Sequence, residues 1–310
     1  MTELHVVLGA SGGAGRAVVR ELVARGKRVR AVTRAGALVP GAESARADAA
    51  SPESVRDAVR GASVVYHCIN VPYQQWARRL FPIADAIIEA AAAAGAKLVV
   101  MDNLYMYGRV SGPMTERTPR QAQGKKGRLR AALERHLLEA HRSGKARLAI
   151  GRASDFLGPQ ARSATMLLVV EPALAGRPAS WLGTLDAPHT VSYLPDVGWG
   201  LATLGEREEA FGEVWHLPAG PPLTGRQLIE MVFQELGRPA RMKVISRPMM
   251  LAAGLFSSGI REAIEVLYQF EHPFVMDATK FSRAFGSRVT PHRDAVRQTI
   301  EGSRGPGAPR

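Results

Sequence analysis

The sequence predicts an α/β fold in which helices cover both faces of a doubly wound parallel sheet. The chain opens with an apolar run, Leu4–Leu8, followed by a glycine-rich turn and a helical segment, Arg16–Ala24. A second β-like run, Arg28–Thr33, follows and completes a strand–helix–strand unit. Further along, short apolar runs keep alternating with helical ones, as right-handed crossovers between parallel strands require.

The next elements continue this alternation. Ser51 before Pro52 indicates a helix start, because serine caps the first turn and proline is favoured within it. The strand and helix runs that follow are Val64–Ile69, Phe81–Ala94, Leu98–Met101, Leu129–Ala140 and Arg147–Ile150. Together with the opening glycine turn, they predict a Rossmann-type sheet.

Beyond Gly158 the composition changes, because eight prolines between residues 159 and 222 interrupt the alternation. Leu223–Leu236 reads as an amphipathic helix ended by Gly237, and Pro248–Phe270 as a helical region rich in Met and Leu. We therefore predict a Rossmann domain over 1–158 with a returning segment at about 190–217. A smaller, mostly helical substrate-binding region covers 159–189 and 218–302, and a mobile tail covers 303–310.

Composition narrows the class of protein. With 310 residues and 46% hydrophobic content, the chain can bury a large core. The lone Cys68 excludes an intrachain disulfide and a Cys-rich zinc site, and we expect no metal. We find no secretory leader and no long apolar stretch, so we expect a cytoplasmic protein without a membrane partner. The net charge of +13 raises the question of nucleic acid, but arginines are spread along the chain and aromatics make up only 6%, so we expect none.

The glycine turn predicts a dinucleotide site. Gly9 suits the tight turn, Gly12 the close approach of a phosphate, and Gly15 the packing of the helix on the strand. Ser11 and Gly13 complete the loop, whose backbone N–H groups and helix dipole would face a pyrophosphate. The alternative is a plain glycine-rich turn, which the surrounding strand–helix–strand unit makes less favourable.

The next candidates concern the adenosine end. Arg34 stands at the end of the second strand, where an NAD-specific site places an acid, and a guanidinium there can pair with a 2′-phosphate. We therefore predict NADP(H), the alternative being that Arg34 only lies on a solvated loop. Asp48, at the end of the third strand, and Asn70, after the fourth, are further candidate contacts. A surface turn is the alternative for Asp48.

Five segments, in order, resemble the extended short-chain dehydrogenase/reductase family of the NAD(P)-dependent epimerase/dehydratase type. Taken singly each match is loose, but their order along most of the chain is specific. The segments are Gly9-x-x-Gly12-x-x-Gly15, Val65-Tyr66-His67-Cys68, Tyr107-Gly108, Arg152-Ala153-Ser154-Asp155-Phe156-Leu157-Gly158-Pro159 and Tyr193-Leu194-Pro195-Asp196-Val197.

The resemblance fails at the family's proton-transfer residues, a Ser or Thr after the fifth strand and a Tyr-x-x-x-Lys on the next helix. Counting along the matched segments puts Asn103 at the Ser/Thr position, Lys126 at the Tyr position and Arg130 at the Lys position. Lys126 and Arg130 lie one helical turn apart, on one face. The alternative is a solvated basic helix end.

These substitutions leave a short set of candidates for the reaction. For proton transfer or carbonyl contact they are Asn103, Tyr105, Lys126 and Arg130, and Arg130 and Asp155 are also candidate cofactor contacts. We expect Tyr107 to be structural and His67 to be a core histidine.

The resemblance implies an atypical branch that lacks Tyr-x-x-x-Lys and includes ketoreductases that tailor angucyclinone-type antibiotics. It implies an NADPH-dependent reductase of the EC 1.1.1 type for a bulky, apolar ketone, as a monomer or homodimer, with water or a substrate hydroxyl as proton source. Two alternatives stay open: a sugar-nucleotide epimerase or dehydratase, and a non-catalytic NADP(H) redox sensor. Pro248–Phe274 should close an apolar cleft in an enzyme and present an exposed patch in a sensor.

Overall fold

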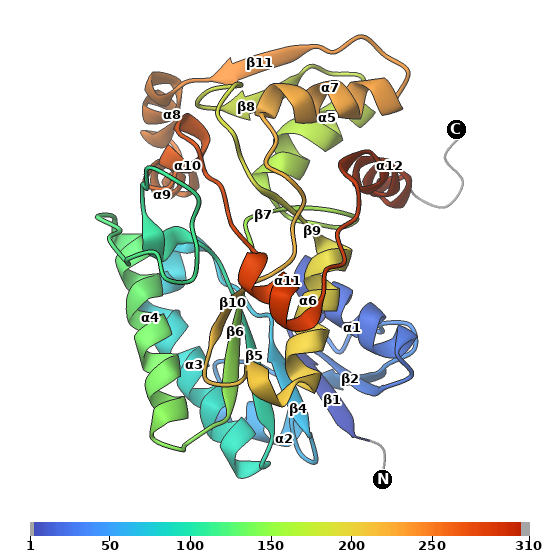
Figure 1. Cartoon of the computed structure of the whole chain (residues 1–310), viewed down its shortest axis with the longest axis vertical. Coiled ribbons are helices and arrows are strands. Elements are labelled where there is room, and N and C mark those ends of the chain that lie inside the picture. Colours follow the sequence, from blue (N-terminus) through green and yellow to red (C-terminus); the bar gives the residue numbers. More distant parts are fainter. Residues whose placement is uncertain (1–2, 305–310) are drawn as a thin grey trace.

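The structure, a computed structural model, describes residues 3–304. Its centre is a parallel sheet with the strand order β10-β6-β5-β4-β1-β2-β3, which confirms the predicted doubly wound α/β fold (Figure 1). Its strands are β1 Leu4–Leu8, β2 Arg28–Thr33, β3 Glu43–Arg46, β4 Val64–His67, β5 Lys97–Asp102, β6 Leu148–Arg152 and β10 Val214–His216.

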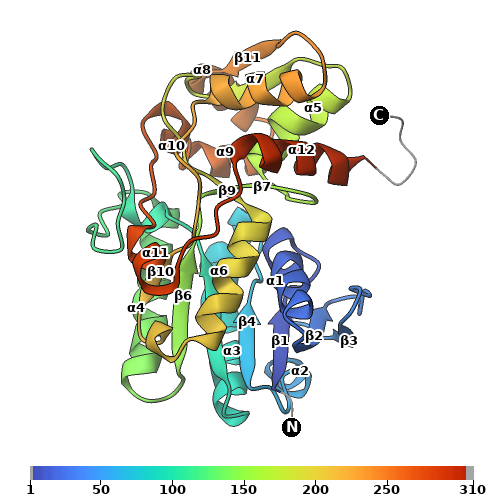
Figure 2. The same cartoon turned by 45° about the vertical axis from the view of Figure 1, so that its right-hand side comes forward.

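Two apolar cores form on the two faces of this sheet, because successive strand side chains point in opposite directions. In β1, Val7 packs into the core under α1 and α6, whereas Val6 and Leu8 pack under α2, α3 and α4 (Figure 2). All three are almost fully buried, as parallel strands covered on both faces require. These helices are α1 Gly13–Ala24, α2 Pro52–Ala58, α3 Trp76–Ala93, α4 Lys125–Arg142 and α6 Leu194–Glu206.

The predicted helix starts are confirmed in part. Ser51 caps α2, since its hydroxyl accepts the N–H of Ser54, and Pro52 opens the first turn. Helix α3 begins at Trp76, five residues before the predicted start, and runs through Pro82. Trp76 is buried and its indole N–H donates to the carbonyl of Val71 at 2.8 Å, which anchors the early start.

A second region lies above the carboxyl edge of the sheet (Figure 1). It holds two short parallel pairs, β7 (Asp155–Leu157) with β9 (Val191–Tyr193) and β8 (Ala179–Leu182) with β11 (Met242–Ile245). The segment predicted as one helical region, 248–270, divides into three short helices. The helices here are η3 Met166–Val170 (a π-helix), α5 Glu171–Leu174, α7 Gly225–Glu235, α8 Arg247–Gly254, α9 Ser258–Ile264, α10 Tyr268–Glu271 and α12 His292–Ser303. Helix α11, Thr279–Phe285, packs instead against β10 of the sheet.

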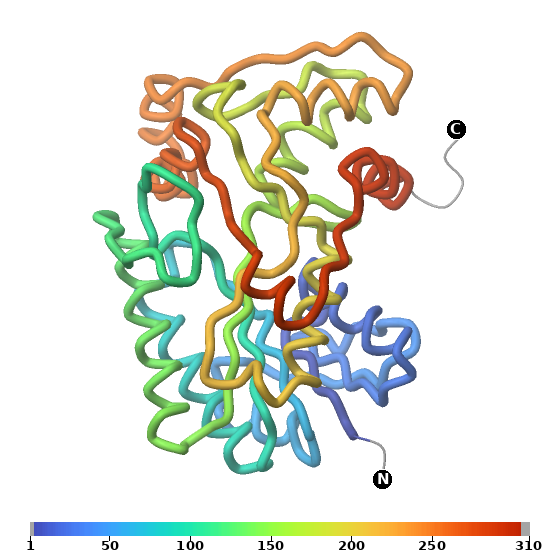
Figure 3. The backbone as a smooth tube through the Cα atoms, in the orientation of Figure 1, coloured from blue at the N-terminus to red at the C-terminus, as the bar shows by residue number. Residues whose placement is uncertain are grey.

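The chain crosses between the two regions several times (Figure 3). After β9 it returns to the sheet, where α6 packs against α1 and β10 pairs with β6. Helix α7 carries a capping box between Thr224 and Gln227, and Gly237, with φ of +64°, follows its end as predicted. The exact domain boundaries stay a prediction. Of the predicted mobile tail, Ser303 ends α12, and residues 305–310 lie outside the described residues.

Candidate functional site

The loop after β1 has a backbone that admits only glycine at two points. Gly9 has φ of +83°, and a Cβ there would lie 2.9 Å from the carbonyl oxygen of Cys68. A Cβ on Gly15 would lie 2.3 Å from the Gly9 carbonyl oxygen, so α1 packs directly on the turn. Both positions therefore behave as the motif predicts.

The first turn of α1 is open toward solvent. Gly12 is the N-cap and supplies no side-chain cap, and both Gly12 and Ser11 are exposed. The first-turn N–H groups of a helix have no partner within the helix, and here the positive end of the dipole adds to them. This cradle fits a pyrophosphate.

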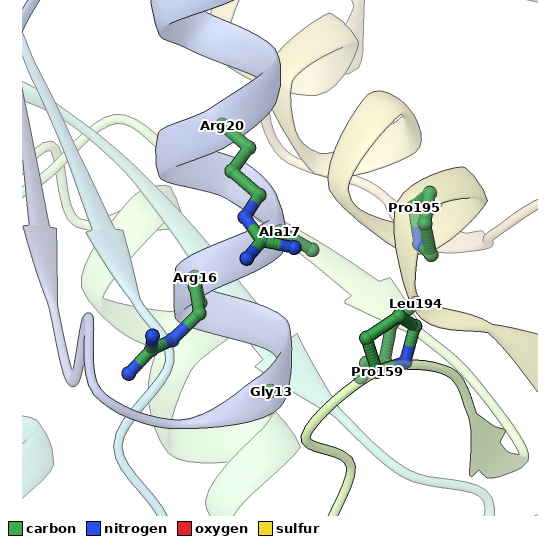
Figure 4. Close-up of a pocket in the computed structure, with 7 residues that line it drawn as sticks. All are labelled: Gly13, Arg16, Ala17, Arg20, Pro159, Leu194 and Pro195. Atoms are coloured by element: carbon green, nitrogen blue, oxygen red, sulfur yellow. The ribbon is translucent and has the colours of Figure 1, made fainter. Parts of the chain in front are cut away.

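The second region closes against the same loop. Figure 4 shows Leu194 and Pro159 beside the first turn of α1, where they line a shallow pocket, while Arg16 points away from them. A Cβ on Gly13 would lie 2.7 Å from Leu194 Cδ1. Gly13 therefore allows the start of α6 to pack against the loop at the predicted cofactor site.

Arg34 follows β2 as an exposed side chain, and the structure records no hydrogen bond or ion pair for it among residues 3–304. The two arginines within this strand pair with Glu43 instead. Arg30 Nε lies 2.9 Å from the Glu43 carboxylate, and Arg28 lies 3.8 Å from it. Asp48 accepts the N–H of Ala50 at 3.0 Å, inside its own turn. The end of β2 is therefore followed by a cation, Arg34. The last residues of the strand include no carboxylate.

Arg130 and Asn70 meet at the carboxyl ends of β4 and β5. The Arg130 guanidinium donates to Asp102 Oδ1 at 3.1 Å and to Asn70 Oδ1 at 3.2 Å, and it lies 4.0 Å from the ring centre of Trp76. Its Nε is buried without a partner in the described part of the chain. Arg130 is therefore a rigid donor at the sheet edge with one hydrogen bond unused.

Two phenols form a pair beside this edge. The hydroxyls of Tyr105, in the 3₁₀ turn η2 (Tyr105–Tyr107), and Tyr73, in η1 (Tyr73–Gln75), lie 2.7 Å apart. Burial raises the pKa of both, and the charge of Asp155 raises them further. Both phenols are protonated at neutral pH and can donate protons. Asn103 Oδ1 accepts the N–H of Tyr105 at 3.0 Å and so fixes this turn.

Tyr73 was not among the residues predicted from sequence. It follows β4, as Asn70 does, and loops after the carboxyl ends of strands build the sites of such sheets. That rule could have found it.

Lys126 is tied to the second region. Its side chain is 2% exposed, and Nζ lies 2.5 Å from Glu262 and 3.2 Å from Glu265, on α9 and at its end. Its backbone N–H also donates to Glu265. The hydrogen bond from Lys126 Nζ lowers the pKa of the Glu262 carboxyl. The ammonium thus serves as a link between α4 and α9, with Tyr73 next to it, 5.2 Å from Nζ to the ring centre.

A buried charge network lies around Arg152, at the end of β6. Arg152, fully buried, donates to Asp102 at 3.3 Å and to the Tyr107 hydroxyl at 2.7 Å, and Glu134 lies 2.8 Å from its guanidinium. Tyr107 also contacts His216 Nε2 at 2.7 Å. Tyr107 is therefore part of the structural support, as expected.

The remaining two candidates have partners of their own. His67 is buried, and burial together with Arg130 lowers its pKa to about 4, so it is a neutral core histidine. Asp155 begins β7, and its Oδ2 lies 2.8 Å from Nε2 of His189, a residue that sequence reasoning missed. No local signal marks His189.

Fold and loop together define a dinucleotide-binding α/β protein. Residues 9–141 match the family described as NAD(P)H-binding, and this stretch contains the glycine loop. Comparison with curated protein sequences gives no match. Within residues 3–304, no helix is long and apolar enough to cross a membrane.

Solved structures of sugar-nucleotide enzymes share the whole fold. A dTDP-glucose 4,6-dehydratase double mutant from Streptomyces venezuelae, with NAD bound, gives a TM-score of 0.77 at 19% identity over 97% of this chain and 96% of that chain. A UDP-glucuronic acid 4-epimerase from Bacillus cereus, in complex with NAD, gives 0.78 at 16% identity over 96% of each chain. A nucleoside-diphosphate-sugar epimerase from Pseudomonas aeruginosa gives 0.75 at 20% identity over 97% of each chain.

Proposed function

We propose that this protein is an NADPH-dependent ketoreductase that reduces a carbonyl of a bulky, largely apolar small molecule without the Tyr-x-x-x-Lys pair. The observation that carries the proposal is the Tyr73–Tyr105 hydroxyl pair, 2.7 Å apart, next to the carboxyl edge of the sheet. Burial keeps the Tyr105 phenol protonated at neutral pH, so its proton is available to the alkoxide that forms on hydride transfer, which is a much stronger base than phenolate.

The cofactor would lie along this edge. The glycine loop, with Ser11 and Gly13, would hold the pyrophosphate, and Arg34 would pair with the 2′-phosphate. Arg130 and Asn70 would contact the nicotinamide half, and Asp48 the adenosine half. NADPH supplies the hydride when bound.

The chain's own residues orient the carbonyl and supply the proton. Tyr105 donates a hydrogen bond to the carbonyl oxygen and transfers its proton as negative charge develops there. Tyr73 then donates to the Tyr105 oxygen, which stabilises the phenolate until solvent restores the proton. Asn103 fixes the turn that carries Tyr105, and Lys126 holds α9 beside Tyr73. We assign both to positioning.

A sugar-nucleotide epimerase or dehydratase is the second candidate, supported by the activities named for the structures that share this fold. Those reactions begin by oxidising a hydroxyl, which needs a base. The raised pKa values of Tyr73 and Tyr105 disfavour that role at neutral pH.

An NADP(H)-binding regulator is the third candidate, favoured by an exposed apolar patch on α8 and the turn after it. Met249, Leu251, Leu255 and Phe256 are all more than half exposed, and Phe256 is 93% exposed. Patches of this kind often bind other proteins. Leu267, Phe270 and Phe274, further along the same segment, are buried, so the patch is confined to α8 and the turn after it.

Calorimetry with NADPH and NADH, followed by NADPH oxidation with a panel of aromatic ketones and sugar nucleotides, tests the proposal. Preferred binding of NADPH with turnover of a ketone supports a reductase. Turnover of a sugar nucleotide supports the second candidate. Binding without turnover across the panel supports the regulator. We propose a cytoplasmic monomer or homodimer in each case.

A further inference from the structure

A buried histidine in the second region contacts two hydrogen-bond acceptors. His189 is 2% exposed, its Nε2 lies 2.8 Å from Asp155 Oδ2, and its Nδ1 lies 3.0 Å from the carbonyl oxygen of Gln269. Gln269 O can only accept, and a neutral imidazole carries one N–H. Both contacts are hydrogen bonds only if the ring carries two N–H groups or the Asp155 carboxyl carries the extra proton.

The surroundings favour the proton on the ring. The rings of Phe270 and Phe274 stack on His189 at centroid distances of 5.0 and 5.4 Å, with interplanar angles of 6° and 25°. Aromatic faces attract a cation, and a carboxylate beside it adds to that attraction. An imidazolium at His189 would donate one N–H to each of these two acceptors.

Asp155 keeps one oxygen for a ligand. Only Oδ2 has a recorded partner among residues 3–304, and the side chain is 16% exposed. Asp155 starts β7, shortly after β6 ends, and its charge is close enough to raise the pKa of both Tyr73 and Tyr105. Oδ1 is thus a fixed, charged acceptor beside the proposed proton donors.

We propose that His189 is a positioning residue that holds Asp155 as a carboxylate, and that Asp155 Oδ1 accepts a hydrogen bond from a hydroxyl group of the substrate. This inference rests on the proposed reductase and narrows its substrates to ketones that carry a hydroxyl donor next to the carbonyl. A carboxylate cannot accept from an ether, so the O-methyl analogue of such a ketone loses the contact and leaves the charge less well solvated.

The first test reads the histidine directly and needs no activity. Two-bond ¹H–¹⁵N spectra of ¹⁵N-histidine-labelled protein at neutral pH, with the His189 signal assigned through His189→Gln, should show an imidazolium. Asp155→Asn should convert the same ring to the neutral form, whereas Asp57→Asn, a change on exposed α2, should leave it unchanged. A neutral ring in the unaltered protein overturns the inference. If His189→Gln does not fold, Asp155→Asn assigns the signal instead.

The second test compares 2-hydroxy-1-tetralone with 2-methoxy-1-tetralone, by binding in the presence of NADP⁺ and by kcat/KM with NADPH. The unaltered protein should favour the hydroxy ketone by roughly 10- to 100-fold, and Asp155→Asn should remove most of that preference. Equal binding of the two ketones, or binding of neither, overturns the substrate assignment. Turnover of other ketones without this preference overturns the inference and leaves the reductase standing. Absence of all turnover with an imidazolium at His189 counts against the reductase and not against the ion pair.

Discussion

Replacing Lys126 with methionine separates a structural from a chemical role for this residue. Lys126 Nζ contacts Glu262 at 2.5 Å and Glu265 at 3.2 Å, and these ion pairs join α4 to α9 across the two regions. Methionine keeps most of the packed stem and removes the charge. We expect a loss of folding stability and a change in the mobility of α9.

The magnitude follows from the burial of the three groups. Breaking a fully buried ion pair costs about 3–5 kcal/mol. Here the lysine is buried but Glu262 and Glu265 keep 35% and 25% of their side-chain exposure, so water partly replaces the lost partner. Discounting for that screening gives about 2 kcal/mol. Urea unfolding at pH 7, monitored by circular dichroism, measures it.

The Lys126–Glu262 ion pair should also make the folding stability depend on pH. Lys126 lowers the pKa of Glu262, so the folded state binds its proton less readily than the unfolded chain does. The stabilisation is therefore complete above the unfolded value of about 4.3 and is lost as the pH falls through the lower folded value. The difference between Lys126→Met and the unaltered protein should be largest at neutral pH and shrink in acid.

Lys125 is the matched control, because it is the preceding residue of the same helix and is exposed. Lys125→Met should change stability by less than about 0.5 kcal/mol. If Lys126→Met is as stable as Lys125→Met, the ion-pair argument is wrong. If Lys126→Met keeps its stability but loses turnover of a ketone that the unaltered protein reduces, Lys126 acts in proton transfer.

Three further predictions concern the cofactor, the proton donor and the core histidine. Arg34→Asp should reduce the preference for NADPH over NADH by roughly 10- to 100-fold, measured as a ratio of Kd values, and an unchanged ratio contradicts the 2′-phosphate assignment. Tyr105→Phe should lower kcat by about 10²- to 10⁴-fold with little change in KM, and near-normal turnover removes Tyr105 from the reaction. His67 has a pKa near 4 in the folded state and about 6.5 in the unfolded chain, so its protonation on unfolding should reduce stability by about 2 kcal/mol between pH 7 and pH 5. His67→Asn should flatten that slope in urea unfolding measured across the same range.

The sheet was predictable because local patterns set it. Strands β1 and β4 are buried along their whole length, and the glycine loop after β1 marks the first crossover. Element boundaries were predicted wrongly where a specific side-chain contact decided them. Trp76 starts α3 early by bonding Val71, and the prediction for 248–270 missed two helix breaks.

The candidate site was predictable only where one segment carries it. The glycine loop needs nearby residues alone, and Asn70 and Arg130 were both named, although nothing local showed that they meet. Lys126 illustrates the limit, since its position suggested chemistry and its contacts with Glu262 and Glu265 come from more than 130 positions further along.

The path of the chain through the second region brings together the polar groups around Asp155. Strand β7 pairs with β9 in a register that places Asp155 opposite Val191, and this pairing brings His189 alongside Asp155 from 34 residues away. Phe270, Phe274 and Gln269 then enclose the ring from a third stretch of chain. An aspartate and a histidine that look unrelated in the sequence thereby form one hydrogen-bonded pair. Because the pair depends on three separate segments, changes in the second region can alter the substrate while the cofactor loop stays unchanged.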